Sequence, residues 1–341
     1  MLRAAVATGL ALLCSLATPT ELKVAGTSED ELQLLQTFYK VGGAGRNGQD
    51  SVNASAAPGN GPRDLVFMHL PYNFGHTIEK NAAWGSGPQA DQAFARSIMA
   101  TPLLDAVGVN GSTALMPQPP TVHDLAWGFL SPELWARKSN VTGCPLYLTP
   151  PKHWPTDLAE AYVGSKKVFG ILRDPYERLV AIFRGDGSGY SKGYEKAFET
   201  CDVNKAVKAM MKMHLAGANP FRDNCIFIPQ AEYFDGPYGV ALPVDNRNFP
   251  ASINQVFAKH GYPEMRINLT DILHVTGCPQ VWPGDLDNET RALVQRIYRK
   301  DFDLLCKHFG HCSTEENACI WQIPTMCPDR VMRKGYNGTQ M

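Results

Sequence analysis

The chain has 341 residues, 32 basic and 33 acidic side chains, and a formal net charge of −1 at pH 7. A chain of this length can bury a large core as one domain, or as one domain with a small appendage. Its balanced charge excludes a bulk attraction to nucleic acid or to an anionic membrane, so any site for an anion must be local.

The first residues have the pattern of a secretory targeting segment. Arg3 precedes an uncharged, mainly apolar run over residues 4–17. As a helix this run would be about 21 Å long, which is short of the roughly 30 Å hydrocarbon core of a bilayer. We therefore expect residues 1–17 to be a cleaved signal peptide, with a short signal anchor as the alternative. Contact with a membrane is expected only through this segment, if it stays uncleaved.

Sequons and cysteines also favour the lumen of the secretory pathway. N-x-S/T sequons begin at Asn53, Asn110, Asn140, Asn268, Asn288 and Asn337. Cys14 lies in the targeting segment, and an even set follows it: Cys144, Cys201, Cys225, Cys278, Cys306, Cys312, Cys319 and Cys327. This set predicts disulfides, and the lack of a C-x-x-C pair argues against a zinc site. Four of these cysteines fall in the last 36 residues. They predict a disulfide-rich C-terminal tail, which we place at residues 311–341.

The segment between the targeting sequence and the first strand is expected to be a short helix and a linker. Residues 28–40 have an amphipathic helical pattern, and residues 41–63 are rich in Gly, Asn, Ser, Ala and Pro. Residues 18–63 therefore precede a folded domain, which we expect over residues 64–310.

Within that domain, apolar runs alternate with helical patterns. We expect strands at 65–68, 145–148, 168–172 and 225–228, and helices from Thr77 and at 89–106, 176–184, 202–216 and 289–309. This alternation predicts an α/β fold, in which a P-loop-like parallel sheet has helices on both faces.

The turn over residues 71–77 is a candidate anion site. A strand that runs through a tight turn into a helix presents the helix's first N–H groups and the positive end of its dipole. Gly75 allows a close approach of the backbone to a phosphate. The G-K-[ST] ending of a Walker loop is absent, which argues against a nucleoside triphosphatase or kinase.

A second candidate segment is Arg173-Asp174-Pro175-Tyr176-Glu177-Arg178, which follows the apolar run 168–172. Arginine suits a phosphate site because its planar guanidinium forms two parallel hydrogen bonds with phosphate oxygens. The simpler structural interpretation of Arg173 is an ion pair with a neighbouring carboxylate.

Together the two segments resemble the nucleotide-binding segments of the Golgi carbohydrate sulfotransferases, in the branch that includes the heparan-sulfate and uronyl 2-O-sulfotransferases. HLPYNFGHT (69–77) is similar to H-[LI]-P-K-T-G-G-T-S. RDPYER (173–178) matches the start of R-[DN]-P-x-x-R-x-x-S-x-[YF], whose serine position is residue 181. The blocks FIPQAEYF (227–234) and DNETRALVQRIYRKDFDLL (287–305) extend the similarity over roughly residues 64–310. Among the positions that depart from the family, Tyr72 replaces its lysine, His76 a Gly or Thr, and Ala181 a serine.

This resemblance implies a sulfotransferase fold and the donor 3′-phosphoadenosine 5′-phosphosulfate (PAPS), with no metal cofactor. Its implied donor-binding residues are Pro71, Tyr72, Asn73, Phe74, Gly75, His76, Thr77 and Arg173. The lysine that Tyr72 replaces offsets charge on the leaving phosphate, and His76 is a candidate substitute for that cation.

The acceptor hydroxyl also needs a base. The candidates are His123, beside Asp124, with His153 and Glu79 as alternatives, whereas Lys152 and His153 alternatively line an acceptor groove.

The function expected from this resemblance is transfer of a sulfuryl group from PAPS to a hydroxyl of a glycan in the Golgi lumen. Two other interpretations stay open. One is a sulfotransferase-fold protein that binds glycan or nucleotide with impaired catalysis, as the changes at Tyr72 and Ala181 suggest. The other is a disulfide-rich secreted binding module, which accounts for the tail but not for the two α/β segments. Neither a nucleic-acid partner nor a metal is expected.

Overall fold

The computed structural model describes residues 62–94, 136–185, 195–275 and 277–332, and the single residues 128, 131 and 134. The expected targeting segment, the helix and linker before residue 62, and His123 lie outside these residues. So does the end of the helix expected at 89–106, of which residues up to 94 are helical. No helix in the described part of the chain is long and apolar enough to cross a membrane.

Three parallel strands form the sheet that organises the molecule. They are β1 (Leu65–Phe67), β2 (Lys167–Leu172) and β3 (Leu242–Asp245), and their order in the sheet is β1-β2-β3. Because neighbouring strands run in the same direction, their carboxyl ends lie at one edge of the sheet, where ligands usually bind in α/β proteins. The segments that follow β1 and β2 therefore begin side by side.

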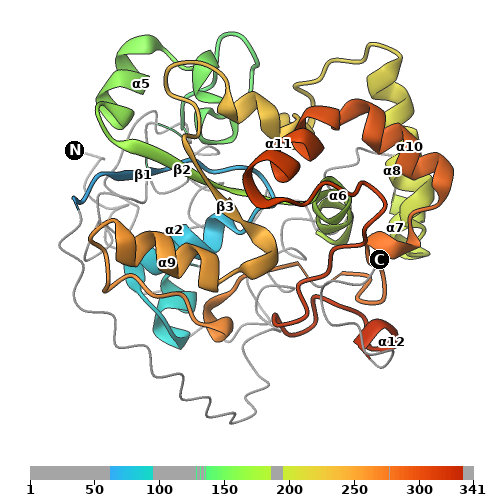
Figure 1. The fold of residues 1–341 in the computed structure, drawn as a ribbon. Coiled ribbons are helices and arrows are strands. Elements are labelled where there is room, and N and C mark those ends of the chain that lie inside the picture. Colours follow the sequence, from blue (N-terminus) through green and yellow to red (C-terminus); the bar gives the residue numbers. More distant parts are fainter. Residues whose placement is uncertain are drawn as a thin grey trace, which may run out of the picture.

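Helices cover both faces of this sheet, as the sequence predicts. In Figure 1, α2 (Gly75–Trp84) and α9 (Ala251–Lys259) lie below the strands and α5 (Thr156–Val163) lies above them. Alternate strand residues supply the two cores. Phe67 and Phe169 pack with the residues of α2 and α9, whereas Val66 and Val168 pack on the opposite face.

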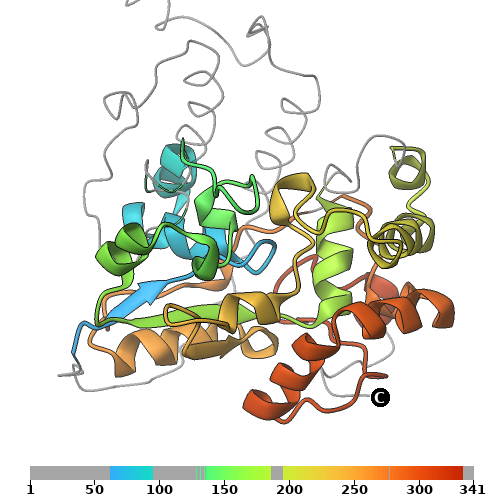
Figure 2. The ribbon, with the colours of Figure 1, turned by 90° about the horizontal axis from the view of Figure 1, so that it is seen from above.

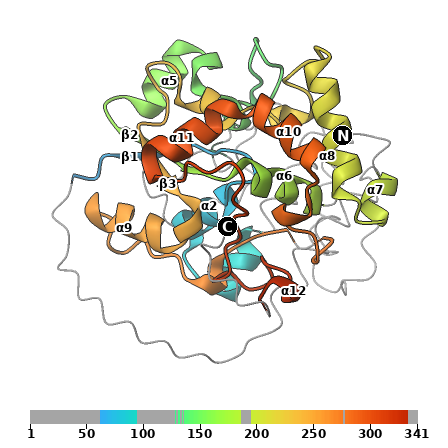
Figure 3. The ribbon, with the colours of Figure 1, turned by 45° about the vertical axis from the view of Figure 1, so that its right-hand side comes forward.

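Several helices pack together beyond the carboxyl end of β2. The second candidate segment, residues 173–178, connects β2 to the first of them. Figure 2 shows β2 leading directly into α6 (Pro175–Arg184), and Figure 3 brings the neighbouring helices forward. Asp174 caps α6 by accepting hydrogen bonds from the N–H groups of Tyr176 and Glu177, and Pro175 is its first residue. The neighbours of α6 are α7 (Glu195–Glu199), α8 (Val203–Leu215), α10 (Asn288–Ile297) and α11 (Arg299–Phe309), and α12 (Asp329–Met332) ends the described chain.

Three sequence expectations about these elements are wrong. The run 145–148 contains a 3-10 helix, Leu146–Leu148, because Leu148 N–H bonds to the carbonyl of Pro145. The run 225–228 is a turn after the 3-10 helix Asp223–Cys225. The helix expected at 289–309 is two helices, which meet at Tyr298. The other 3-10 helices are Pro151–His153, Gln230–Phe234, Asn246–Asn248, Leu269–Asp271 and Pro283–Asp285.

The break at Tyr298 has a physical cause in two side chains. Tyr298 is 1% exposed, and its hydroxyl donates to the carbonyl of Phe227 over 2.8 Å. One turn later the buried Asp301 accepts the N–H groups of Gln230 and Ala231 over 2.9 and 2.8 Å. These three hydrogen bonds hold the start of α11 against residues 227–231.

The structure confirms the prediction that the cysteines after Cys14 form disulfides. All eight cysteines after Cys14 are joined, as Cys144–Cys225, Cys201–Cys278, Cys306–Cys312 and Cys319–Cys327. The last pair closes a short loop whose Ile320, Ile323 and Met326 are buried in the core beside α9. The cysteine-rich tail up to residue 332 therefore packs onto the α/β domain.

Candidate functional site

The turn after β1 has an unusual backbone that prepares the start of α2. Tyr72 and Phe74 both have left-handed φ values, 63° and 60°. Such residues are uncommon outside glycine. Within the turn, the N–H of Asn73 donates to the carbonyl of Leu70 over 3.2 Å and that of Thr77 to the carbonyl of Phe74 over 3.0 Å. Helix α2 begins at Gly75, directly after this turn. The segment 71–77 is therefore shaped like a site for an anion at a helix amino end.

Two side chains fix this turn to the rest of the molecule. The amide of Asn73, which is 1% exposed, donates to the carbonyl of Ile171 over 2.7 Å and to Gln230 Oε1 over 2.5 Å. The hydroxyl of the buried Thr77 accepts the N–H of Leu273 over 2.9 Å. Both residues thus hold the turn through protein contacts.

Arg173 brings the second candidate segment into direct contact with the first. Its Nη1 donates to the carbonyl of Tyr72 over 2.6 Å, and its guanidinium lies over the ring of Phe74, 5.0 Å from the centroid. Its Nη2 is 3.5 Å from Glu177 Oε1. The side chain of Arg173 is only 3% exposed. In this structure Arg173 thus holds the turn and forms an ion pair with a carboxylate in the first turn of α6, the helix that follows it.

Arg178, which matches the second segment of the pattern, also contacts the turn: its Nε donates to the carbonyl of Pro71 over 3.1 Å. Two positions that depart from the pattern, Tyr72 and Ala181, lie along α6. The ring of Tyr72 packs beside Gly185 at the end of α6, where an added Cβ would lie 3.0 Å from it. Ala181 is buried in α6. Tyr72 therefore fills space near the far end of α6.

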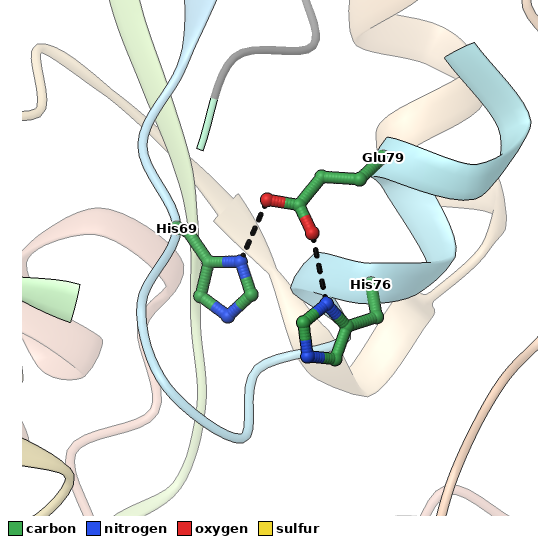
Figure 4. Close-up of side chains that lie close together, drawn as sticks. All are labelled: His69, His76 and Glu79. Atoms are coloured by element: carbon green, nitrogen blue, oxygen red, sulfur yellow. Dashed lines mark hydrogen bonds and ion pairs between the residues drawn. The ribbon is translucent and has the colours of Figure 1, made fainter. Parts of the chain in front are cut away.

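The strongest constellation of titratable groups joins the end of β1 to the first turn of α2. His69 Nδ1 and His76 Nδ1 each lie 2.9 Å from one oxygen of the Glu79 carboxylate, as Figure 4 shows. His69 is 4% exposed and Glu79 is fully buried, whereas the His76 side chain is 35% exposed. We call these three residues the His–Glu–His cluster. One of its rings is therefore accessible, and its carboxylate is not.

The carboxylate of this cluster is ionised. Burial opposes its charge, but His69 and His76 more than offset burial and lower the pKa of Glu79 to about 2. Tyr147 lies next to it, with its ring 5.5 Å from that of His69, and burial together with the charge of Glu79 raises the pKa of the Tyr147 phenol. The negative charge of Glu79 in the cluster and the neutral phenol of Tyr147 thus lie close together.

A second polar group lies at the carboxyl edge of the sheet. Within the described part of the chain, five buried atoms there make no hydrogen bond: Asn73 Oδ1, Arg173 Nε, Glu177 Oε1, Asn246 Oδ1 and Arg247 Nε. They come from the segments after β1, β2 and β3, and Asn246 Nδ2 links to Glu177 Oε2 over 2.7 Å. Buried polar atoms are nearly always hydrogen-bonded. This edge is therefore well suited to receive a polar ligand.

Two other sequence candidates, His153 and Lys152, lie apart from these groups. The ring of His153 packs edge-on against Phe221, and burial lowers its pKa. Lys152 forms ion pairs with Glu232 and Asp235 over 2.6 and 3.0 Å. His123 lies outside the described residues. Among the described candidates, His76 and Glu79 are therefore the two that belong to the cluster.

His69 is the functional candidate that sequence reasoning missed. In the sequence, His69 stands out only as the first residue of the segment HLPYNFGHT. The available signal was the spacing H-x6-H-x2-E, which puts His76 and Glu79 on neighbouring positions of one helix face.

Comparisons with protein-family models, curated proteins and solved structures found no match for this chain. Function must therefore be inferred from the residues and their geometry.

Proposed function

We propose that this protein transfers a sulfuryl group from PAPS to a hydroxyl of a glycan. In the reaction, the acceptor oxygen forms a bond to sulfur as the bond from sulfur to the leaving phosphate breaks, and a base takes the hydroxyl proton. His123 is the candidate base, and His76 is the candidate for the cation that offsets charge on the leaving phosphate.

One observation carries this proposal. The turn 71–77 and the segment that begins at Arg173 are about a hundred positions apart in the chain, yet Arg173 Nη1 lies 2.6 Å from the carbonyl of Tyr72. Both segments follow neighbouring parallel strands. A donor with a phosphosulfate at one end and a 3′-phosphate at the other requires two such anion sites side by side.

The unpaired atoms at the sheet edge give further support. Arg173 Nε and Arg247 Nε are N–H donors without a protein acceptor among the described residues. A phosphate oxygen is a strong acceptor for both. The proposal requires the 3′-phosphate to compete with Glu177 for Arg173.

Exposed sequons are consistent with a protein of the secretory lumen. Asn140, Asn268 and Asn288 are exposed, and all four disulfides suit an oxidising compartment. We therefore place the reaction in the Golgi lumen.

A second candidate function is binding of nucleotide or glycan without efficient catalysis. Two observations favour it. The ring of Tyr72 replaces a lysine and packs beside Gly185, and Arg173 is already paired with Glu177. Both remove positive charge from the place where a leaving phosphate would need it.

Calorimetry with the desulfated donor PAP tests both functions, with AMP as the matched ligand that lacks the 3′-phosphate. We expect PAP to bind at least tenfold more tightly than AMP, which is about 1.4 kcal/mol. No binding of either ligand would contradict sulfuryl transfer and nucleotide binding, and would leave glycan binding alone. Turnover of radiolabelled PAPS over a panel of glycans, with hydrolysis in the absence of acceptor measured alongside, then separates the enzyme from the binding protein.

A further inference from the structure

We propose that the His–Glu–His cluster of His69, His76 and Glu79 binds one divalent transition-metal ion, with zinc as the best-fitting ion. This site goes beyond sulfuryl transfer, which needs no metal.

The geometry of the three side chains supports a common ligand. Both rings turn toward the two oxygens of the carboxylate, and the potential ligand atoms all lie within 4.8 Å of one another. Two atoms bound to one zinc ion at about 2.1 Å lie roughly 3.0–3.4 Å apart. The two N···O distances of 2.9 Å are close to this requirement. Ligand atoms that are up to 4.8 Å apart would have to move closer together on binding, and His76 is the most exposed of the three side chains.

The chemistry of the side chains also suits a cation. Glu79 is fully buried, and a carboxylate in a protein interior is costly unless a partner balances its charge. Imidazole nitrogens with one carboxylate oxygen are a common ligand set for zinc and other first-row metals.

The backbone around the cluster is built to hold these side chains. At Gly75 an added Cβ would lie 2.5 Å from the ring of His69. At Gly128, which has a left-handed φ of 50°, an added Cβ would collide with Glu79. No larger residue fits at either position without moving a candidate ligand. The partly exposed ring of His76 leaves a path for the ion to enter.

The choice of ligands is narrowed by the cysteines. Every described cysteine is in a disulfide, so thiolate ligands are not available from this part of the chain. The ion would therefore be held by nitrogen and oxygen alone, with its remaining positions filled by water or substrate.

One consequence rests on the proposed function. Such an ion would place positive charge next to the turn 71–77, where Tyr72 replaces the lysine of the sulfotransferase pattern. His76 would then be a metal ligand, and the ion would supply the positive charge for which His76 is otherwise the candidate.

The test is a zinc titration of the full, untagged chain, expressed with its disulfides and stripped with EDTA. In calorimetry near pH 7.5 we expect one zinc ion per chain with a dissociation constant in the micromolar range or below. X-ray absorption should show nitrogen and oxygen neighbours that include two imidazoles, and no sulfur. Failure to bind zinc at about 100 μM would overturn the proposal.

Variants locate the site. His76→Gln and Glu79→Gln should each weaken binding at least tenfold, since even the loss of an outer partner of a ligand costs about 10–100-fold. His153→Gln is the matched control, because this ring lies outside the cluster, and it should leave affinity unchanged. His76 is partly exposed, so its variant should fold, which circular dichroism checks. Equal affinity of His76→Gln and the natural chain would assign the zinc to another place. No nucleotide is present in the titration, so its outcome is independent of whether PAP binds.

Discussion

Replacement of Arg173 by alanine should destabilise the protein strongly, even without any ligand. The guanidinium of Arg173 is buried against Glu177, Tyr72 and Phe74. Removing one partner of a buried ion pair leaves the other charge uncompensated and costs about 3–5 kcal/mol. We expect the lower end, about 3 kcal/mol, for two reasons. The Nη2 to Oε1 distance of 3.5 Å is long for a hydrogen bond. Glu177 also keeps its bond from Asn246.

A double-mutant cycle with Glu177→Gln measures how much of this cost comes from the pair. Urea unfolding of the four proteins should give a coupling energy of about 1–3 kcal/mol, the range for residues in one network. Arg299→Ala, on the exposed surface of α11, is the control and should change stability by less than about 0.5 kcal/mol. A cost below about 1 kcal/mol for Arg173→Ala, or strict additivity, would contradict the buried pair. The cycle also sets the conditions under which a folded Arg173 variant can be tested for loss of PAP affinity.

Three further predictions follow from other parts of the molecule. If the chain turns over PAPS, Tyr72→Lys should raise the rate of PAP release several-fold, because it adds a cation near the leaving phosphate; an unchanged rate with intact PAP binding would show that another cation already fills this place. Asp287 caps α10 by accepting the N–H of Thr290 over 2.8 Å, so Asp287→Ala should cost about 1 kcal/mol in urea, and Asp287→Asn much less, since asparagine also caps. The mature protein should show no reactive thiols under denaturing, non-reducing conditions and a mass loss with endoglycosidase; several thiols or no mass loss would remove the case for a luminal protein.

The elements that could be predicted from the sequence are those whose local signals agree with their burial. Strand β2 is a buried apolar run, and Asp174 and Pro175 mark the start of the next helix in the sequence itself. Strand β3 was missed because Leu242–Asp245 contains a proline and is mostly half-buried, so it has neither an apolar run nor a clear alternation. The run 225–228 misled because an apolar segment of this length can be buried as a turn as well as a strand.

The site was predictable only in part, for a related reason. Sequence motifs placed the turn 71–77 and the Arg173 segment, but the direction of each side chain depends on residues far away in the chain. His69 faces Glu79 in a space bordered by Gly128, some fifty positions beyond. Arg173 faces Glu177, which lies in the first turn of the next helix and plays no part in the phosphate interpretation.

That pairing makes a further prediction about PAP binding and pH. Burial raises the pKa of Glu177, and Arg173 opposes this effect. If a 3′-phosphate takes over Arg173, the opposing effect is weakened and the pKa of Glu177 rises further, so that the complex binds more protons than the free protein. By linkage, affinity must then fall as pH rises between the free and bound pKa values of Glu177, by at most tenfold per pH unit.

The control for this effect lies in the ligand and in Glu177 itself. The second ionisation of a phosphate, near pH 6, makes the ligand more anionic and would by itself strengthen binding as pH rises. A decline in PAP affinity that sets in above the ordinary glutamate pKa of 4.5 and outweighs this gain therefore points to Glu177. Glu177→Gln should bind PAP more tightly, because an amide competes less well than a carboxylate for Arg173, and should lose the decline. A variant that keeps the decline, or a natural chain that binds PAP with no decline, would show that the phosphate does not displace Glu177 from Arg173.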